Sequence, residues 1–172
     1  MKIFRTKSNT ANFWLDVALI TATLTCICFI FFWPVRVSGN SMSPTLNIGD
    51  QLIVSRFMGF LGNHLHGDLV MAQVDIDGST ETIIKRIAAT PGDHLVITGN
   101  ALYINGQQQY WPYIKSTLPG AVDIMLNYNE YFLLSDNLAI SKDSRHFGPV
   151  TNRQISARII LRYFPLSVIE IF

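Results

Sequence analysis

Ser41 lies in a turn-rich stretch, residues 38–50, which reads S-G-N-S-M-S-P-T-L-N-I-G-D. Gly, Asn, Ser and Pro favour irregular turns, and a hydroxyl on such a turn is open to a substrate, whereas a strand would half cover it. Serine-rich turns are also common as plain surface loops. Ser41 is therefore a candidate nucleophile that needs support from other parts of the chain.

Lys85 is the candidate base for that serine. In T-I-I-K-R-I-A, strand alternation puts Ile83, Lys85 and Ile87 on one face and Ile84 and Arg86 on the other. A lysine between isoleucines is partly removed from water, which lowers its pKa and favours the neutral amine. A neutral amine can take the proton of a serine hydroxyl. The alternative is a strand-edge lysine that extends its ammonium into water.

A third candidate stretch, residues 135–150, reads S-D-N-L-A-I-S-K-D-S-R-H-F-G-P-V. Asp143 and Arg145 are close enough in a turn to form an ion pair. Ser141 and Ser144 offer hydroxyls that could orient an amine. The alternative for this stretch is a solvated loop with an incidental ion pair.

The histidines give no argument for a metal site. His64 and His66 form H-x-H, but no third ligand lies near them in the sequence, and serine–lysine chemistry needs no metal. His146 is expected to pack beside Arg145. We predict neither a metal nor a cofactor.

The elements that must position these residues have the pattern of short strands. The strand-like segments are residues 51–57, 68–74, 81–88, 94–97, 101–104, 130–134 and 154–164. Asp77-Gly78, Gly99-Asn100 and Asn105-Gly106 are expected turns, and residues 58–67, 107–129 and 135–148 are expected loops. With no convincing amphipathic helix, residues 36–172 are predicted to form a mainly β, largely antiparallel domain.

The N-terminal region predicts a membrane anchor. Residues 1–12 are basic, and residues 13–33 are apolar with Asp16 as their only charge. Twenty-one helical residues span about 30 Å, the hydrocarbon thickness of a bilayer, and Pro34 ends the run. A cleaved secretory signal is the alternative, but no small-residue cleavage site follows. The charge distribution predicts a single-pass protein with a cytoplasmic N-terminus and residues 36–172 on the outer face.

The composition limits the kinds of partner that this protein is expected to bind. The formal net charge of +1 over 172 residues gives no argument for nucleic acid, and 49% hydrophobic residues with 15% charged ones suit a membrane protein. Cys26 and Cys28 both lie in the apolar run and are expected to be apolar filler. The apolar residues Phe57, Met58 and Phe60, with Leu61, either form a membrane-facing patch or cover the core.

Three segments together resemble a known family. S-M-S-P-T-L with G-D (residues 41–50), I-K-R-I-A-A-T-P-G-D (residues 84–93) and S-D-N-x-x-x-S-K-D-S-R-x-F-G (residues 135–148) are similar to the three signature boxes of type I signal peptidases. Their order is the same, and an anchor precedes them as in that family. The likeness extends from Arg36 to about Pro165.

The resemblance implies a catalytic mechanism without histidine or metal. In it, Ser41 is the nucleophile and Lys85 the general base. Ser141 hydrogen-bonds the lysine amine, and Asp143 with Arg145 forms an ion pair that supports the site. The Ser41 backbone N–H and a second, unidentified donor would hold the oxyanion.

The resemblance also implies the substrate, the location and the fold. Val37, Met42 and Ile84, with Gly39, would line shallow pockets for Ala, Gly or Ser at the first and third positions before the cut. The substrates would be signal-peptide-bearing precursors, cut at the inner (cytoplasmic) membrane. The fold would be the coiled antiparallel sheets of the signal peptidase catalytic core, with a small insert at about residues 96–129.

Four positions depart from the family pattern. Gly39 stands where many bacterial members carry a serine, and Ala89, Ser135 and Leu138 also differ. With these departures, the sequence is similar to subfamilies that process restricted substrates, such as conjugative-pilin maturases or mitochondrial inner-membrane peptidases. A dedicated maturase is therefore one alternative. The others are a self-cleaving repressor-type Ser-Lys protease and an inactive, membrane-tethered peptide-binding module.

Overall fold

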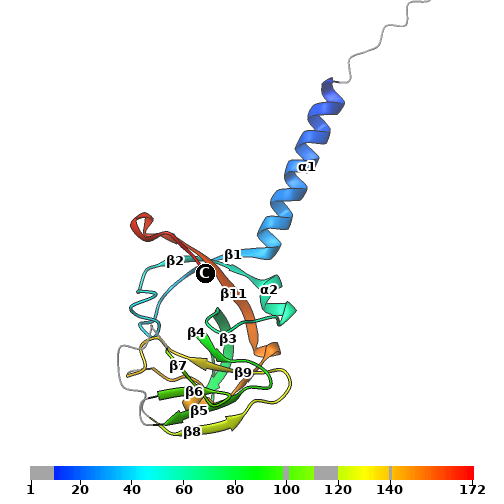
Figure 1. Ribbon diagram of the computed structural model, residues 1–172. Helices are drawn as coiled ribbons and strands as arrows, with labels where there is room; N and C mark the ends of the chain where they lie inside the picture. The colour runs from blue at the N-terminus through cyan, green and yellow to red at the C-terminus, as the bar shows by residue number, and fades with distance from the viewer. Residues whose placement is uncertain (1–9, 99–100, 111–119, 140) are drawn as a thin grey trace, which may run out of the picture. The chain divides into compact units, whose positions relative to one another are not determined.

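The computed structural model describes residues 10–98, 101–110, 120–139 and 141–172 (Figure 1). The chain divides into two compact units, Met1–Phe32 and Trp33–Phe172, and each is described by itself. The turn expected at residues 99–100 and residues 111–119 of the expected irregular segment lie outside the described residues.

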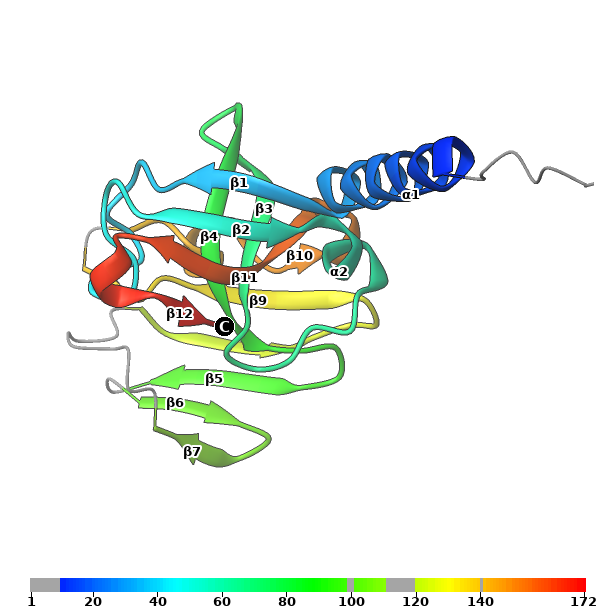
Figure 2. The ribbon, with the colours of Figure 1, turned by 90° about the horizontal axis from the view of Figure 1, so that it is seen from above.

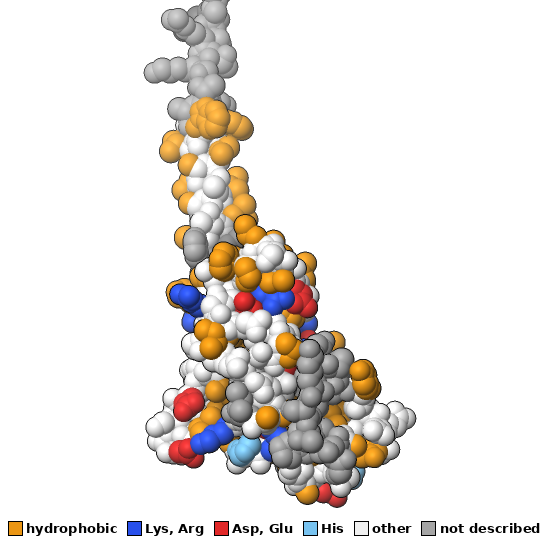
Figure 3. All heavy atoms as spheres, turned by 90° about the vertical axis from the view of Figure 1, so that its left-hand side faces the viewer, with side chains coloured by type: hydrophobic (Ala, Val, Ile, Leu, Met, Phe, Trp, Pro, Cys, Tyr) orange, Lys and Arg blue, Asp and Glu red, His pale blue; other side chains and the backbone are white. Residues whose placement is uncertain are grey.

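The first unit contains helix α1, Thr10–Phe31, of 22 residues. Hydrophobic side chains cover much of its visible face (Figure 3). Within the described residues, no helix combines the length and the hydropathy that a membrane crossing requires. The assignment of residues 13–33 as a membrane anchor therefore stays a prediction. Residues 32 and 33 lie beyond the helix, in strand β1.

A large sheet dominates the second unit (Figure 2). Its strand order is β1-β2-β11-β3-β4-β9-β10, with β12 paired to β11. The strands are β1 (Phe32–Arg36), β2 (Gln51–Ser55), β3 (Leu69–Ile76), β4 (Ser79–Ala89), β9 (Glu130–Leu134), β10 (Val150–Thr151), β11 (Ile155–Phe164) and β12 (Glu170–Ile171). Every pairing from β2 to β10 is antiparallel, as is that of β11 with β12.

A smaller antiparallel sheet follows β4 in the chain. It has the order β7-β6-β5-β8, with β5 at His94–Thr98, β6 at Ala101–Ile104, β7 at Gln107–Gln109 and β8 at Val122–Met125. Asn105 and Gly106 turn between β6 and β7 with positive φ angles of 53° and 77°. The prediction of a mainly β, antiparallel domain is confirmed.

Helix α2, Arg56–Leu61, corrects two sequence predictions. The strand expected at residues 51–57 ends at Ser55, and part of the expected loop at residues 58–67 is helical. The cause is local: the Ser55 hydroxyl accepts the Met58 N–H at 3.3 Å as an N-cap, and Gly62 ends the helix with φ 71°. The apolar side chains of this helix are 39–80% exposed and form a surface patch, while Gly59 packs closely against Ala157 of β11.

Four further elements, β7, β8, α3 and β12, were not predicted from the sequence. Strands β7 and β8 lie in the segment predicted as a polar loop. They pair with β6 and β5, and these pairings give the segment its regular structure. Helix α3, Ser144–Phe147, lies in the loop expected at residues 135–148 and is capped by Asp143. Strand β12 pairs with β11 in the C-terminal segment. These four elements have only two to four residues each, which is too short to leave a periodic pattern in the sequence.

Strand β4 lies between separate parts of the core. Ile84 packs with a cluster that includes Val37 and Met42, whereas Ile83 and Ile87 pack with a cluster on the other side. This arrangement follows the alternation expected for residues 83–87. Lys85 is therefore held on a strand that is fixed by apolar contacts on both faces.

Candidate active site

The turn that carries Ser41 is held by its own apolar residues. Met42 and Leu46 are 2% and 0% exposed, and the Leu46 N–H donates to the Met42 carbonyl at 2.9 Å. The Ser41 carbonyl accepts the Asn137 N–H at 2.9 Å, which ties the turn to the loop after β9. These contacts fix the turn around Ser41, while Ser41 itself stays partly exposed.

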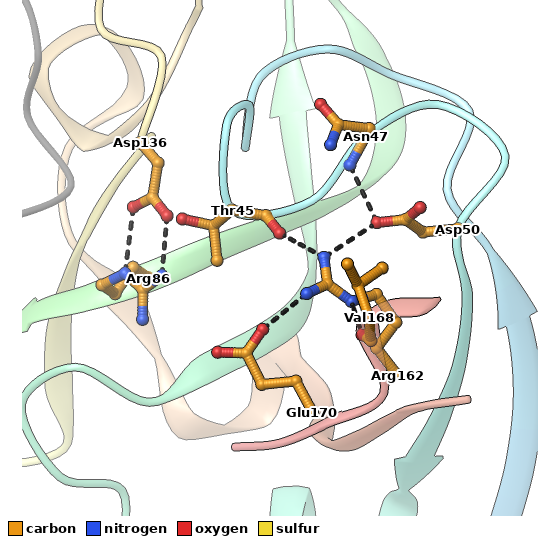
Figure 4. A network of polar contacts seen from close by, with 8 residues as sticks. All are labelled: Thr45, Asn47, Asp50, Arg86, Asp136, Arg162, Val168 and Glu170. Atoms are coloured by element: carbon orange, nitrogen blue, oxygen red, sulfur yellow. Dashed lines mark hydrogen bonds and ion pairs between the residues drawn. The ribbon is translucent and has the colours of Figure 1, made fainter. Parts of the chain in front are cut away.

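A buried arginine fastens the far end of the same turn (Figure 4). The Arg162 guanidinium, on β11, donates to the Thr45 carbonyl at 2.6 Å and to the Asp50 carboxylate at 3.2 Å. It also pairs with Glu170 at 2.6 Å and reaches the Val168 carbonyl at 2.9 Å. The sequence patterns do not predict this network, because Arg162 lies 117 and 112 residues from its two partners in the turn.

Lys85 is 2% exposed, so the alternative of an ammonium that reaches water is wrong. Burial lowers the pKa of its amine from 10.5 to about 8. The negative charge of Asp143 raises this pKa and the positive charge of Arg145 lowers it, both by less than burial does, and Asp136 raises it further. A lysine with this pKa has a substantial neutral fraction near neutral pH.

The ion pair expected between Asp143 and Arg145 is present. The guanidinium donates to both carboxylate oxygens, at 2.7 and 2.9 Å, and the two side chains are 0% and 4% exposed. Asp143 also caps helix α3 and accepts the Ser135 N–H at 3.1 Å, while Arg145 donates to the Leu138 carbonyl at 3.1 Å. One buried pair therefore joins helix α3 to the end of strand β9.

A second buried ion pair, which no pattern in the sequence predicts, lies next to Lys85. Arg86 donates to both carboxylate oxygens of Asp136, at 2.9 and 2.6 Å, and to the Gly67 carbonyl at 2.7 Å (Figure 4). Arg86 and Asp136 both lie within the motif segments, but they are 50 residues apart, so no local sequence pattern indicates that they pair. It links β4 to the loop after β9, which also carries Asn137.

Ser41, Lys85 and Ser141 line one cavity of about 430 Å³. The three predicted motif residues thus come together although they lie in three separate segments of the chain. The Ser141 hydroxyl oxygen is buried and forms no hydrogen bond within the described residues. The remaining lining residues of this cavity are Asn40, Ile76, Glu81, Ile83 and Lys142.

A second cavity, of about 420 Å³, shares Ser41 with the first. All four predicted pocket residues line it: Val37, Gly39, Met42 and Ile84. A Cβ atom at Gly39 would meet no other atom within 4 Å, so this position is open. The residues that the sequence did not single out are Val35, Arg36, Ser38, Leu46, Met71, Glu81, Thr82 and Ile83.

The two histidines of H-x-H have separate environments. His64 is 5% exposed and contacts the ring of Tyr131 edge-on, with 5.3 Å between centroids. His66 Nε2 lies 2.7 Å from the Asp93 carboxylate. Among residues 10–98, 101–110, 120–139 and 141–172, no three His, Cys, Asp or Glu side chains form a group able to hold a metal ion.

A serine and a buried, partly neutral lysine that line one cavity of a mainly β domain are compatible with a serine peptidase. Comparison with known proteins extends this class assignment. Residues 10–164 match the family model described as signal peptidase, peptidase S26. The chain belongs to this family and is a serine peptidase of the signal peptidase I type.

Individual relatives agree with the family match. The chain is 30% identical to a signal peptidase I of Bacillus amyloliquefaciens, over 95% of this chain and 91% of that protein. It is 29% identical to that of Bacillus licheniformis, over 95% and 94%. The crystal structure of a signal peptidase I from Enterococcus faecalis V583 shares the fold, with a TM-score of 0.50 and 20% identity over 56% of this chain and 96% of that one.

Proposed function

We propose that this protein is a membrane-bound endopeptidase that removes N-terminal signal peptides from exported precursors by cutting after small residues. One observation carries the proposal: a buried lysine with a pKa of about 8 shares a cavity with a turn-borne serine. The family supports the reaction class, and the names of the relatives support the substrate.

In this proposal Ser41 attacks the carbonyl carbon of the scissile bond. At pH 7, about one Lys85 amine in ten is neutral, as a pKa of about 8 requires. That amine takes the Ser41 proton as the tetrahedral intermediate forms and gives it to the leaving amine when the peptide bond breaks. A water molecule then loses a proton to Lys85 and hydrolyses the acyl-enzyme, which restores the Ser41 hydroxyl.

Ser141, Asp143 and Arg145 support the base in this proposal. The Ser141 hydroxyl lines the cavity with Lys85 and has no hydrogen-bond partner among the described residues, so it is available to the amine. The Asp143–Arg145 pair fixes the loop between β9 and helix α3, on which Ser141 lies. Because both charges also act on the pKa of Lys85, the pair tunes as well as positions the base.

The second cavity holds the substrate residues that precede the cut. Residues 35–39 and residues 81–84 of β4 are among the residues that line it. Val37, Met42 and Ile84 are apolar and packed in one cluster, which leaves a shallow surface suited to Ala, Gly or Ser. The open space at Gly39 admits the peptide backbone close to Ser41.

We further propose that residues 13–33 anchor the enzyme in the inner membrane, with the N-terminus in the cytoplasm and the catalytic domain outside. The support is the apolar sequence, with basic residues Lys2, Arg5 and Lys7 before it. The exposed apolar side chains of helix α2 suit contact with a lipid surface. An anchored enzyme meets precursors that are themselves held in the bilayer.

The test uses the full-length protein in detergent and a precursor with an A-x-A cleavage site. Ser41→Ala and Lys85→Met are expected to abolish cleavage, whereas Ser43→Ala, a serine in the same turn that lines neither cavity, retains it. A serine-directed acylating inhibitor is expected to label the wild type and not Ser41→Ala. Wild-type cleavage rates in both active-site variants would refute the proposal.

The comparisons lend no support to a dedicated maturase or to an inactive peptide-binding module. A panel of unrelated precursors separates the first from a general enzyme. Labelling of Ser41 separates the second from any peptidase.

A further inference from the structure

Glu81 lines both cavities of the candidate active site, although no catalytic role requires it. Among the described residues that line these two cavities, Glu81 is the only acidic one. Its place on their shared wall puts a negative charge along the path of a bound peptide.

Strand geometry sets the distance from Glu81 to the reacting groups. Glu81, Ile83 and Lys85 lie at alternate positions of β4 and all line the cavity with Ser41. Four residues of strand at about 3.3 Å each separate Glu81 from Lys85 by about 13 Å. Glu81 is therefore too far to join the chemistry but close enough to contact a residue of the same peptide.

The edge of β4 that carries Glu81 is open. Residues 79–86 pair with β3 on one side, and β9 pairs on the other side only with Arg86, Ile87 and Ala89. Among the described residues, the second edge of residues 79–85 has no strand partner, and the β3–β4 hairpin projects past the neighbouring strands (Figure 2). An extended peptide can lie along this edge, in the cavity that residues 35–39 also line.

The Glu81 carboxylate is available to a ligand. It is exposed and forms no ion pair within the described part of the chain. The other acids of the hairpin are engaged: Asp75 accepts the Thr80 hydroxyl at 2.6 Å, and Asp77 pairs with Lys142. Arg36 lines the second cavity as well, so that cavity is lined by one charged residue of each sign.

We infer that Glu81 is a specificity-determining residue that favours substrates with a cationic side chain four or five residues before the scissile bond. The inference rests on the proposed function, in which the second cavity holds the residues before the cut. A peptide that runs along β4 from the scissile bond, near Ser41 and Lys85, passes Ile84 and reaches Glu81 after four strand positions. Lys or Arg there would meet the carboxylate directly.

The experiment compares three precursors that differ only at the fourth and fifth residues before the cut, which are both Lys, both Ala or both Glu. The full-length enzyme in detergent is assayed for kcat/KM at low salt. Since exposed charge pairs are weak, wild type is expected to prefer the Lys precursor to the Glu precursor by about two- to fivefold. Glu81→Gln is expected to remove this preference and Glu81→Lys to reverse it. High salt is expected to reduce the preference of the wild type for the Lys precursor.

Two controls distinguish a specificity role from a structural one. Asp75→Asn removes a nearby carboxylate that lines neither cavity and should leave the preference unchanged. The pH dependence with the Ala precursor should not move in Glu81→Gln, because Glu81 is not among the charges that shift the pKa of Lys85.

The outcomes also separate this inference from the proposed function. If the Ala precursor is cut in a Ser41-dependent way but wild type treats all three alike, only the inference about Glu81 is overturned. The same holds if the preference survives in Glu81→Gln or disappears in Asp75→Asn. If no precursor is cut, or if Ser41→Ala still cuts them, both proposals fail.

Discussion

Replacing Lys85 by methionine should make the protein more stable at neutral pH while it removes the proposed base. Burial lowers the pKa of Lys85 from 10.5 to about 8. Each pKa unit corresponds to about 1.4 kcal/mol, so keeping this amine protonated in the folded state costs about 3 kcal/mol at pH 7. Methionine is apolar, has a similar length and carries no charge to bury.

The pH dependence gives this prediction its sign. Between pH 8 and 10.5 the unfolded chain binds more protons at this residue than the folded chain, so the stability of wild type rises with pH in this window. The advantage of Lys85→Met should therefore be about 3 kcal/mol at pH 7 and fall to about 2 kcal/mol at pH 9, then vanish above the unfolded pKa.

The assay is urea unfolding of the full-length protein in detergent at several pH values, followed by tryptophan fluorescence. Lys142→Met, which removes an exposed lysine, is the matched control and should change the free energy of unfolding by less than about 1 kcal/mol. Cleavage by Lys85→Met should fall by at least about a hundredfold. A variant that is less stable than wild type at pH 7, by an amount independent of pH, would refute the reasoning.

Three other predictions concern Lys85, Ser141 and Asp143. The kcat/KM of wild type should rise with pH through about 8 and then level off, because deprotonation of Lys85 creates the base that we propose. Ser141→Ala should lower kcat by about ten- to hundredfold through loss of a hydrogen bond to the amine, yet change stability by less than about 1 kcal/mol, since its buried hydroxyl has no partner among the described residues. Asp143→Asn should lower the free energy of unfolding by about 3–5 kcal/mol, because it removes the carboxylate from the buried Arg145 guanidinium. Asp123→Asn, whose carboxylate is 74% exposed, is the control and should cost less than about 1 kcal/mol in the same urea titration.

Features that depend on neighbouring residues were predictable from the sequence. The turn at Asp77-Gly78 joins β3 and β4 with positive φ angles of 52° and 83°, as the dipeptide predicts. Strand alternation around Lys85 predicted which side chains share its face. Helix α2 was missed because its apolar start looks like a strand, although Ser55 is a recognisable N-cap.

Features that depend on contacts between distant segments were not predictable. The motif residues Ser41, Lys85 and Ser141 were selected by type and by resemblance, but no pattern in the chain indicates that they line one cavity. Asp136 lies 50 residues from Arg86, and Asp50 lies 112 residues from Arg162; many carboxylates lie at comparable separations. Only the folded sheet decides which of them is near.

The Arg162 network has a consequence for biosynthesis. The turn that carries Ser41 leaves the ribosome early, but the guanidinium that fastens its Asp50 end is made 112 residues later, and Glu170 later still. A nascent chain that ends before Arg162 lacks this fastening of the turn. The complete set of contacts that holds the Ser41 turn therefore forms only when strand β11 has been translated and has paired with β2. The position of the turn is thus set by one of the last strands to be made.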